Sequence, residues 1–391
     1  MKPLYYFHPL VWIILSGTIF TRIASFMTMP FLAIYLHNVH HASPILIGFT
    51  IGVAPLFATF GGFLGGYLTD RFGRKIVIII TIFVWGSVFF GFALTTFAPI
   101  FVLLNAINGL CRSFFEPATQ ALMIDFTENE KKRRLFSVRY TAINIAAVIG
   151  PLIGVMISTL ASPVIPFVVT GVMYSVYGLF LLSILNKYEM RQKRLENGKN
   201  IKVILHVVFS DYKLLLFLAG GTLIGLGYAQ FDSTLPQFIQ LTLEDGVKLY
   251  SLLISLNAVV VLILQLPISI LMEKISILTS LIIGIIFFAF GLMMFGIANA
   301  AWLFIVALVI FTIGEIFTFP MMNAVIEEIA PETQKATYLG ASQLKNIGGF
   351  IGPVLGGWLL THFQGQLFFI IALLVLVSIP FYKRAFHLPN S

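Results

Sequence analysis

The chain has 391 residues, of which 59% are hydrophobic and only 10% are charged, and its formal net charge is +8. A soluble domain carries roughly a quarter charged residues, so this composition excludes a water-soluble globular protein. Most of the basic residues lie in loops between apolar runs and form no single patch, which argues against a nucleic-acid-binding protein.

Apolar runs recur along the whole chain, and each is long enough to cross a membrane. A membrane helix needs roughly 20 apolar residues, whereas a barrel strand shows about ten residues of alternating polarity. The runs here are continuous, as in Ile76–Phe97 and Leu278–Ala298, so they predict helices. We expect an all-α membrane protein with twelve spans, at residues 9–36, 44–69, 76–97, 99–126, 136–160, 164–186, 214–241, 249–272, 277–299, 301–326, 337–361 and 366–384.

Lysine and arginine residues gather on alternate loops, and this asymmetry predicts an orientation. They follow the second, fourth and sixth spans and the last span, whereas the loops on the other side carry only Lys248. Positive residues favour the cytoplasmic side, so both termini are predicted to be cytoplasmic in a bacterial inner membrane. The polar stretch 187–213 is predicted to link an N-terminal six-helix bundle, 1–186, to a C-terminal six-helix bundle, 214–391.

The two halves repeat one pattern of glycine, proline and acidic residues. Gly109–Asp125 aligns with Thr312–Glu328, and a Gly-Pro-x-x-Gly segment follows in each half. Parallel repeats of this kind are found in transporters that bind substrate at the repeat interface, and glycine and proline let helices approach closely and bend. The predicted helix-packing and hinge positions are Gly150, Pro151, Gly154, Gly352, Pro353 and Gly356.

The loop between the second and third spans carries a specific motif. Gly66–Lys75 reads Gly-Tyr-Leu-Thr-Asp-Arg-Phe-Gly-Arg-Lys and resembles the signature loop of the major facilitator superfamily. The resemblance implies a fold of two pseudo-symmetric six-helix bundles, a monomeric protein, and a conformational role for this loop. The residues predicted to form a cytoplasmic gate are Asp70, Arg71, Gly73, Arg74 and Lys75, together with Asp125 and Arg139 near the cytoplasmic surface.

Other segments resemble one branch of that superfamily. Gly150–Gly154 resembles the end of a motif associated with antiporters, and the segments around Asp232, Glu315 and Asp125 resemble the LmrP-like multidrug/proton antiporters. In that branch, acids at these three positions belong to cation binding or proton coupling. This chain departs from the branch at Arg139, where an acid is usual, so its proton route or its preference for cationic drugs is expected to differ.

Ionisable residues inside the predicted spans are candidate functional groups, because a charge in the bilayer core is costly unless it is paired or hydrated. Arg112 and Glu116 lie four residues apart on one helix face, and Arg112 and Glu315 are equivalent positions in the repeat. We expect a charge network of these residues with Arg22 across the interface between the halves. A static ion pair of Arg112 with Glu116 is the alternative, and Arg22 could instead bind an anionic substrate group. The residues assigned to proton coupling or substrate recognition are Glu315, Asp232, Glu116, Arg112 and Arg22.

The sequence shows no catalytic or nucleotide-binding motif. It has no Walker-type Gly-Lys-Ser/Thr loop, no Cys-x-x-Cys and no His-Glu-x-x-His, so neither an enzyme nor a cofactor is expected. The His37–His41 loop could bind a metal, but solvated loop histidines are commoner, and no metal site is predicted. Carboxylates in the membrane favour a proton gradient as the energy source.

These observations favour a proton-coupled exporter that moves amphipathic small molecules, such as drugs or a secreted metabolite, by alternating access. The expected partners are therefore a small-molecule substrate, protons and the lipid bilayer. A proton symporter that imports a sugar, a peptide or a metallophore is the alternative. A receptor on the same fold would need a signalling domain or a long tail, and neither is visible in this sequence.

Overall fold

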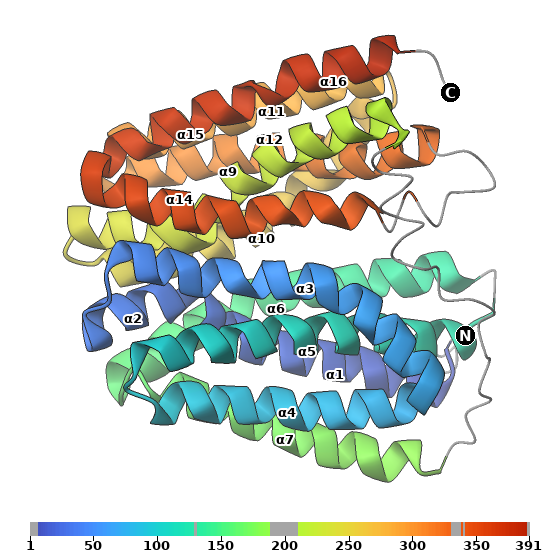
Figure 1. Cartoon of the computed structure of the whole chain (residues 1–391). Coiled ribbons are helices and arrows are strands. Elements are labelled where there is room, and N and C mark those ends of the chain that lie inside the picture. The colour runs from blue at the N-terminus through green and yellow to red at the C-terminus, as the bar shows by residue number, and fades with distance from the viewer. Residues whose placement is uncertain (1–6, 129–130, 188–209, 330–337, 339–340, 389–391) are drawn as a thin grey trace. The chain divides into compact units, whose positions relative to one another are not determined.

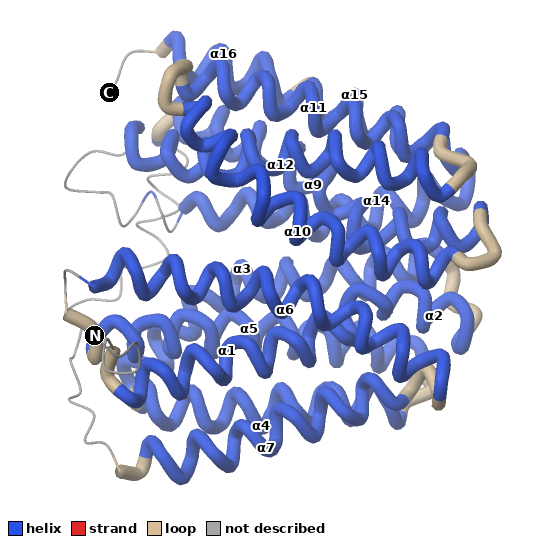
Figure 2. The backbone as a smooth tube through the Cα atoms, turned by 180° about the vertical axis from the view of Figure 1, so that it is seen from behind, coloured by secondary structure: helices blue, strands red, loops and turns tan. Residues whose placement is uncertain are grey.

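The computed structural model describes residues 7–128, 131–187, 210–329, 338 and 341–388 (Figure 1). All regular elements among these residues are α-helices or short 3-10 helices, as Figure 2 shows. The all-helical class predicted from the continuous apolar runs is therefore confirmed for the described chain.

The chain divides into two compact units, and two of the three boundaries between them fall within α2 (Leu32–His40) and α3 (Pro44–Phe72). Unit 1 comprises residues 1–32 and 60–198, and unit 2 comprises residues 33–59 and 199–391. Residues 33–59 therefore group with the second half of the sequence, unlike the predicted bundles 1–186 and 214–391. The arrangement as two six-helix bundles stays a prediction.

Unit 1 is built from helices that begin and end close to the predicted spans. Proline occupies the first turn of three of them, where its missing N–H group is no loss. Gly73 separates two of the helices with a φ of 84°, a conformation that favours glycine. The elements are α1 (Pro9–Thr28), η2 (Met29–Phe31), the second part of α3 (Pro44–Phe72), α4 (Arg74–Leu94), α5 (Ala98–Asp125), α6 (Lys132–Leu160) and α7 (Ile165–Leu185).

Unit 2 contains the remaining elements. Asp211 caps its first long helix by accepting hydrogen bonds from the backbone N–H groups of Lys213 and Leu214, at 2.8 and 3.1 Å. The elements are most of α2 (Leu32–His40), the first part of α3, α9 (Tyr212–Thr242), α10 (Gly246–Met272), α11 (Ile277–Ile297), α12 (Ala301–Ile329), η5 (Ser342–Ile347), α14 (Gly348–Phe363), η6 (Gln364–Gln366), α15 (Leu367–Leu376) and α16 (Ser378–His387).

The first part of α3 packs backbone to backbone against α14 within unit 2. A Cβ atom added at Gly48 would lie 2.0 Å from the carbonyl oxygen of Pro353, and one at Gly52 would lie 2.7 Å from that of Phe350. These distances are too short for any side chain, so the two glycines permit the close contact. Residues 33–59 therefore owe their place in unit 2 to direct helix packing.

The described helices include eleven stretches that are long and apolar enough to cross a membrane. The number differs from the predicted twelve because most of the predicted span 337–361 and all of the span 366–384 fall within one stretch, Ser342–His387. The helix is interrupted within this stretch at Gln364, whose φ is 44°. Figure 1 shows α14 and α15 meeting at one end and running back past each other.

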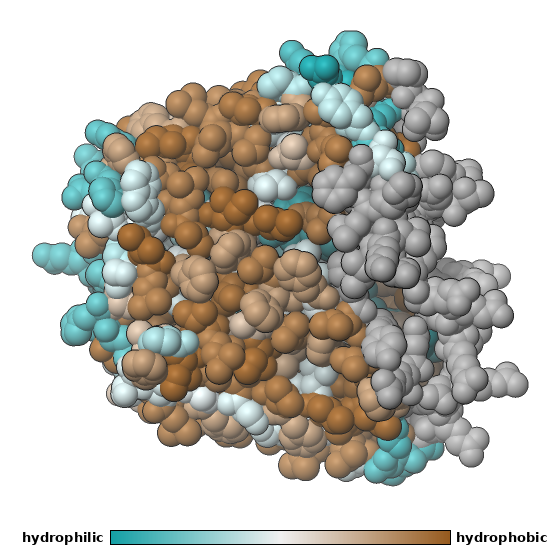
Figure 3. All heavy atoms as spheres, viewed as in Figure 1, coloured by the Kyte–Doolittle hydropathy of each residue, from teal (hydrophilic) through white to brown (hydrophobic). Residues whose placement is uncertain are grey.

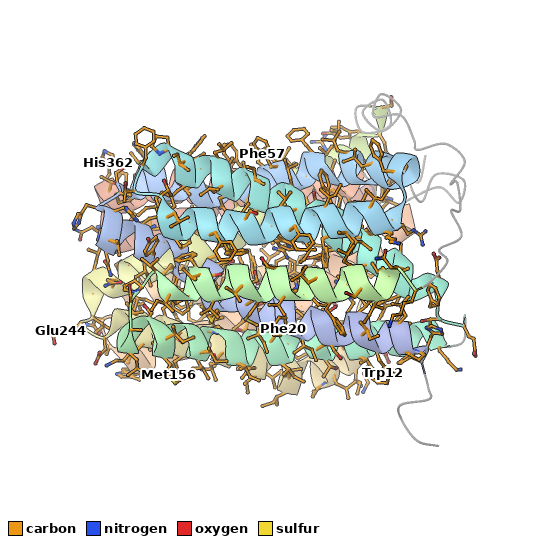
Figure 4. The ribbon with its side chains drawn as sticks, turned by 90° about the horizontal axis from the view of Figure 1, so that it is seen from below. Trp12, Phe20, Phe57, Met156, Glu244 and His362 are labelled. Carbon is orange, nitrogen blue, oxygen red and sulfur yellow. The ribbon has the colours of Figure 1, made fainter. Side chains whose placement is uncertain are left out.

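Large apolar side chains cover the outer surface of these helices. Leu94, Leu160 and Leu266 are between 70% and 83% exposed, which lipid tolerates and water does not. Figure 3 shows one face on which hydrophobic residues extend along the helices and hydrophilic residues gather at the ends. In Figure 4, Glu244, which follows the last residue of α9, and His362, in the last turn of α14, both lie beside helix ends. This distribution is typical of a protein embedded in a bilayer.

Equivalent glycines of the repeat lie at close helix contacts in both units. In unit 1, a Cβ atom at Gly150 of α6 would lie 2.9 Å from the carbonyl oxygen of Ile23 on α1. In unit 2, a Cβ atom at Gly352 of α14 would lie 2.6 Å from the carbonyl oxygen of Leu226 on α9. The Gln230 side chain also donates a 2.9 Å hydrogen bond to the carbonyl oxygen of Gly352. The helix pairs α1–α6 and α9–α14 therefore share one mode of packing.

Candidate functional site

Three arginine side chains, from three helices of unit 1, surround the carboxylate of Glu116. Arg112, one turn earlier on α5, places its Nε 3.0 Å from Glu116 Oε1, and Arg22 of α1 forms an ion pair with the same oxygen. Arg139 of α6 lies 4.0 Å from Glu116 Oε2. Three guanidinium groups thus face one carboxylate, and the cluster carries a net charge of +2 when all four groups are ionised.

The members of this arginine cluster differ in exposure. The side chains of Arg22 and Arg139 are 14% exposed, that of Glu116 is 23% exposed, and that of Arg112 is 59% exposed. Among the residues that the structure describes, Arg139 Nε is buried and has no hydrogen-bond partner. The cluster is therefore half enclosed, with Arg112 as its accessible member.

Sequence analysis brought Arg22, Arg112 and Glu116 together, but it grouped Arg139 with Asp125. The structure separates these two residues, since Asp125 pairs with Arg74 whereas Arg139 faces Glu116. A signal for this placement is present in α6. Arg139 precedes Gly150 by about three helical turns and so shares its face, which packs on α1 next to Arg22.

The predicted gate residues are only partly described. Arg74, at the start of α4, forms an ion pair with Asp125, at the end of α5, and the Lys75 side chain is half-buried. The side chains of Asp70 and Arg71 lie outside the described residues. The Arg74–Asp125 pair ties two helix ends of unit 1 together beside the turn at Gly73, and the role of this loop as a gate stays a prediction.

Glu315 of unit 2 is bound by neutral donors from two neighbouring helices. Tyr228 Oη of α9 donates a 3.3 Å hydrogen bond to Oε1, and Asn257 Nδ2 of α10 donates a 3.0 Å hydrogen bond to Oε2. Asn257 Nδ2 also lies 2.9 Å from Thr312 Oγ1 on α12, one turn before Glu315. Within the described part of the chain, no lysine or arginine forms an ion pair with Glu315.

Aromatic rings surround the tyrosine that binds Glu315. The Phe319 ring meets Tyr228 edge-on at 4.9 Å, and Phe311 stacks with it at 6.0 Å. Phe231 stacks on Phe311 at 5.6 Å. Phe311 and Phe231 are buried, whereas Tyr228 and Phe319 are half-buried. The rings of Tyr228 and Phe319 therefore offer an apolar surface with a negative face, which suits an amphipathic or cationic ligand beside a carboxylate.

Asp232 lies one helical turn beyond Tyr228 on α9, and its side chain is exposed. Residues four apart share a helix face, so Asp232 and the Tyr228–Glu315 pair mark one side of α9. The sequence identified both acids but missed Tyr228 as a partner of Glu315. The predicted network from Arg112 to Glu315 joins residues of different units and stays a prediction.

The described residues contain no group of three or more histidine, cysteine, aspartate or glutamate side chains placed to hold a metal ion. The candidate functional residues form two centres, each described by itself. The arginine cluster lies in unit 1, and the Glu315 centre, formed by Glu315, Tyr228 and Asn257, lies in unit 2.

Comparisons with known proteins point to one family. The model of the Major Facilitator Superfamily matches residues 14–344 and 247–389. The chain is 36% identical to YqjV of Bacillus subtilis (strain 168), an uncharacterized MFS-type transporter, over 97% of this chain and 94% of the relative. It is 27% identical to a Na(+), Li(+), K(+)/H(+) antiporter of Planococcus maritimus, over 87% of each chain. It is 25% identical to the multidrug resistance protein MdtH of Proteus mirabilis (strain HI4320), over 85% of this chain and 82% of the relative.

Solved structures agree with this match at the level of the fold. The nucleoside transporter NupG superposes with a TM-score of 0.81 at 13% identity, covering 98% of this chain and 100% of that chain. A D-xylose-proton symporter superposes with a TM-score of 0.74 at 16% identity, covering 97% of this chain and 98% of that one. At these identities the likeness concerns the fold alone.

Proposed function

Since this chain belongs to the Major Facilitator Superfamily of membrane transporters, we propose that it is a proton-coupled antiporter that exports amphipathic small molecules by alternating access. The observation that carries the proposal is Glu315, an acid inside a membrane helix whose hydrogen-bond donors are neutral. Two relatives support the proposal: one is a cation/proton antiporter, and the other is a multidrug resistance protein.

Glu315 suits the role of proton carrier because it can gain a proton without leaving a charged residue unpaired. Tyr228 and Asn257 are neutral, so protonation of Glu315 leaves no unpaired cation behind in the membrane. Glu116 differs in this respect, since its neutralisation would leave three arginines without their carboxylate. We therefore assign proton coupling to Glu315, with the exposed Asp232 as an accessory acid.

Coupling to the exported molecule follows from the shared residue Tyr228. Tyr228 contacts Phe319 and also donates a hydrogen bond to Glu315. A ligand bound to the Tyr228 and Phe319 rings and a proton bound to Glu315 therefore each change the binding free energy of the other. If the two favour opposite states of the protein, inward proton flow drives outward movement of the ligand.

We also propose that the chain crosses the membrane twelve times as two six-helix bundles. The stretch Ser342–His387 has 46 residues, which as one helix would span about 69 Å, more than twice a hydrocarbon core of about 30 Å. The break at Gln364 supports a division of this stretch into two crossings. The basic loops support a cytoplasmic location of both termini in a bacterial cell. We expect the transporter to be a monomer.

An impermeant amine reagent applied to intact cells is expected to label Lys248 and no other loop lysine. Lys248 is 67% exposed at the start of α10, on the side that the basic loops avoid, and peptide mapping of the labelled protein reads out the site. A Lys248→Arg variant is the matched control and should lose the label. Labelling at Lys187 would contradict the proposed orientation.

A proton symporter that imports a zwitterionic nutrient is the second candidate. The arginine cluster favours it, because positive and negative side chains at one place suit a substrate that carries both charges.

Proton movement in proteoliposomes separates the two functions. The protein is reconstituted with a pH-sensitive dye in the lumen, a pH gradient is imposed, and lipophilic cations, siderophores, peptides and sugars are added in turn. We expect at least one amphipathic compound to drive protons out of the lumen as it enters. Protons that enter together with the compound would establish the symporter and refute the exporter.

A further inference from the structure

The arginine cluster of unit 1 has more hydrogen-bond donors than its single carboxylate can accept. Each guanidinium carries five N–H donors, whereas a carboxylate has about four acceptor sites. Glu116 Oε1 already serves Arg22 and Arg112, and the 4.0 Å separation of Oε2 from Arg139 is too long for a hydrogen bond. Donors in this cluster therefore exceed the acceptors supplied by Glu116.

Arg139 shows where an acceptor is missing. Its side chain is only 14% exposed, and its Nε is buried and has no hydrogen-bond partner among the described residues. A buried donor without a partner costs free energy, and a charged one costs more. An acceptor group that drew the Arg139 guanidinium toward itself would remove this penalty.

The charge balance points in the same direction. The cluster lies on membrane helices α1, α5 and α6, where a net charge of +2 is costly unless water or a counter-ion offsets it. The Arg112 side chain is 59% exposed, so a molecule from solution can approach the cluster on its side. A divalent anion would neutralise this excess, and a monovalent anion would halve it.

We propose that Arg22, Arg112 and Arg139 form a binding site for the anionic group, a carboxylate or a phosphate, of a small-molecule ligand. Guanidinium groups bind both kinds of oxyanion through paired hydrogen bonds. Glu116 occupies part of the site in the absence of ligand and competes for the same donors. The inference rests on the proposed function only in taking the ligand to be the exported molecule, because binding itself needs no gradient.

Calorimetric titration of the full-length protein in phosphatidylcholine nanodiscs tests the site without any transport. The probes are 4-phenylbutanoate, phenyl phosphate and the neutral 4-phenylbutanamide. We expect both anions to bind and the amide not to bind. Arg112→Gln should weaken anion binding about tenfold to a hundredfold, the range for a hydrogen bond between charged groups, and Arg112→Lys should weaken it less. Lys248→Gln, an exposed loop change, should leave it unchanged.

Glu116→Gln gives the sharpest distinction between a binding site and a structural ion network. It removes the competing carboxylate, so anion binding should become tighter while the arginine variants bind more weakly. Equal binding of the acid and its amide, or weaker anion binding in Glu116→Gln, would overturn the proposal. The Arg112→Lys variant tests the site if Arg112→Gln does not fold. Displacement of the probes by phosphatidylglycerol in the nanodisc would assign the site to a lipid headgroup and would also overturn the small-molecule assignment.

Discussion

Replacing Glu315 with glutamine is expected to abolish proton-driven accumulation of the ligand while preserving exchange of ligand for ligand. A gradient of one pH unit stores about 1.4 kcal/mol per proton, enough for a tenfold ligand gradient. Glutamine keeps the size of the side chain and can still bond to Tyr228 and Asn257, but it cannot carry a proton. The accumulation ratio in proteoliposomes should therefore fall from about ten to one.

Two variants make the Glu315→Gln result interpretable. Glu244→Gln removes an exposed carboxylate in the segment between α9 and α10 and should leave the accumulation ratio unchanged. Asn257→Ala removes one donor to Glu315 and should alter the pH dependence of transport without ending the coupling. Persistence of the full gradient in Glu315→Gln would rule out Glu315 as the proton carrier. Loss of ligand exchange as well would assign Glu315 to ligand binding.

Replacing Glu116 with glutamine is expected to lower the unfolding free energy of the protein in micelles by about 3 kcal/mol. Removal of one member of a buried ion pair costs about 3–5 kcal/mol, because the partner is left charged and unpaired. Glu116 is 23% exposed and Arg112 is 59% exposed, so the lower end of the range applies. Denaturant unfolding of the purified protein, followed by circular dichroism in one detergent, measures the change.

A double-mutant cycle checks that this loss comes from the cluster. Arg22→Gln combined with Glu116→Gln should be less destabilising than the sum of the two single changes, because Arg22 and Glu116 form an ion pair. Glu128→Gln is the matched control. It breaks a surface pair with Lys131 in which Glu128 is 71% exposed, so its effect should stay below about 1 kcal/mol. Additive losses at Arg22 and Glu116 would show that the two side chains are not coupled.

The helices were predictable from the sequence because their signals are local. Continuous apolar runs and the glycine and proline residues near their ends placed the segments within a few residues of the described helices, for example 277–299 against Ile277–Ile297. The last two predicted spans fall in a single apolar stretch, because η6 and the Gln364 break have no strongly polar loop around them. The gap predicted between these two spans, residues 362–365, nevertheless contains the break at Gln364.

The contacts within the two centres were less predictable, because they depend on which helix faces meet. Arg112 and Glu116 are four residues apart, and their pairing follows from the helix period alone. The pairing of Glu315 with Tyr228 and Asn257 joins side chains 87 and 58 residues apart in sequence, and no local pattern specifies it. The contact of Arg139 was partly predictable. Its helix face could be inferred from Gly150, but its position along the helix relative to Glu116 could not.

The grouping of residues 33–59 with unit 2 limits how the gene can be divided. The chain passes between the units three times, near residues 32, 59 and 198, so the linker 187–213 is not their only covalent connection. A fragment cut at that linker would carry Gly48 away from the Pro353 backbone on which it packs. A chimera that exchanges the first half for that of a relative therefore needs a compatible α14 as well, and the two pieces of a split gene should associate through this helix.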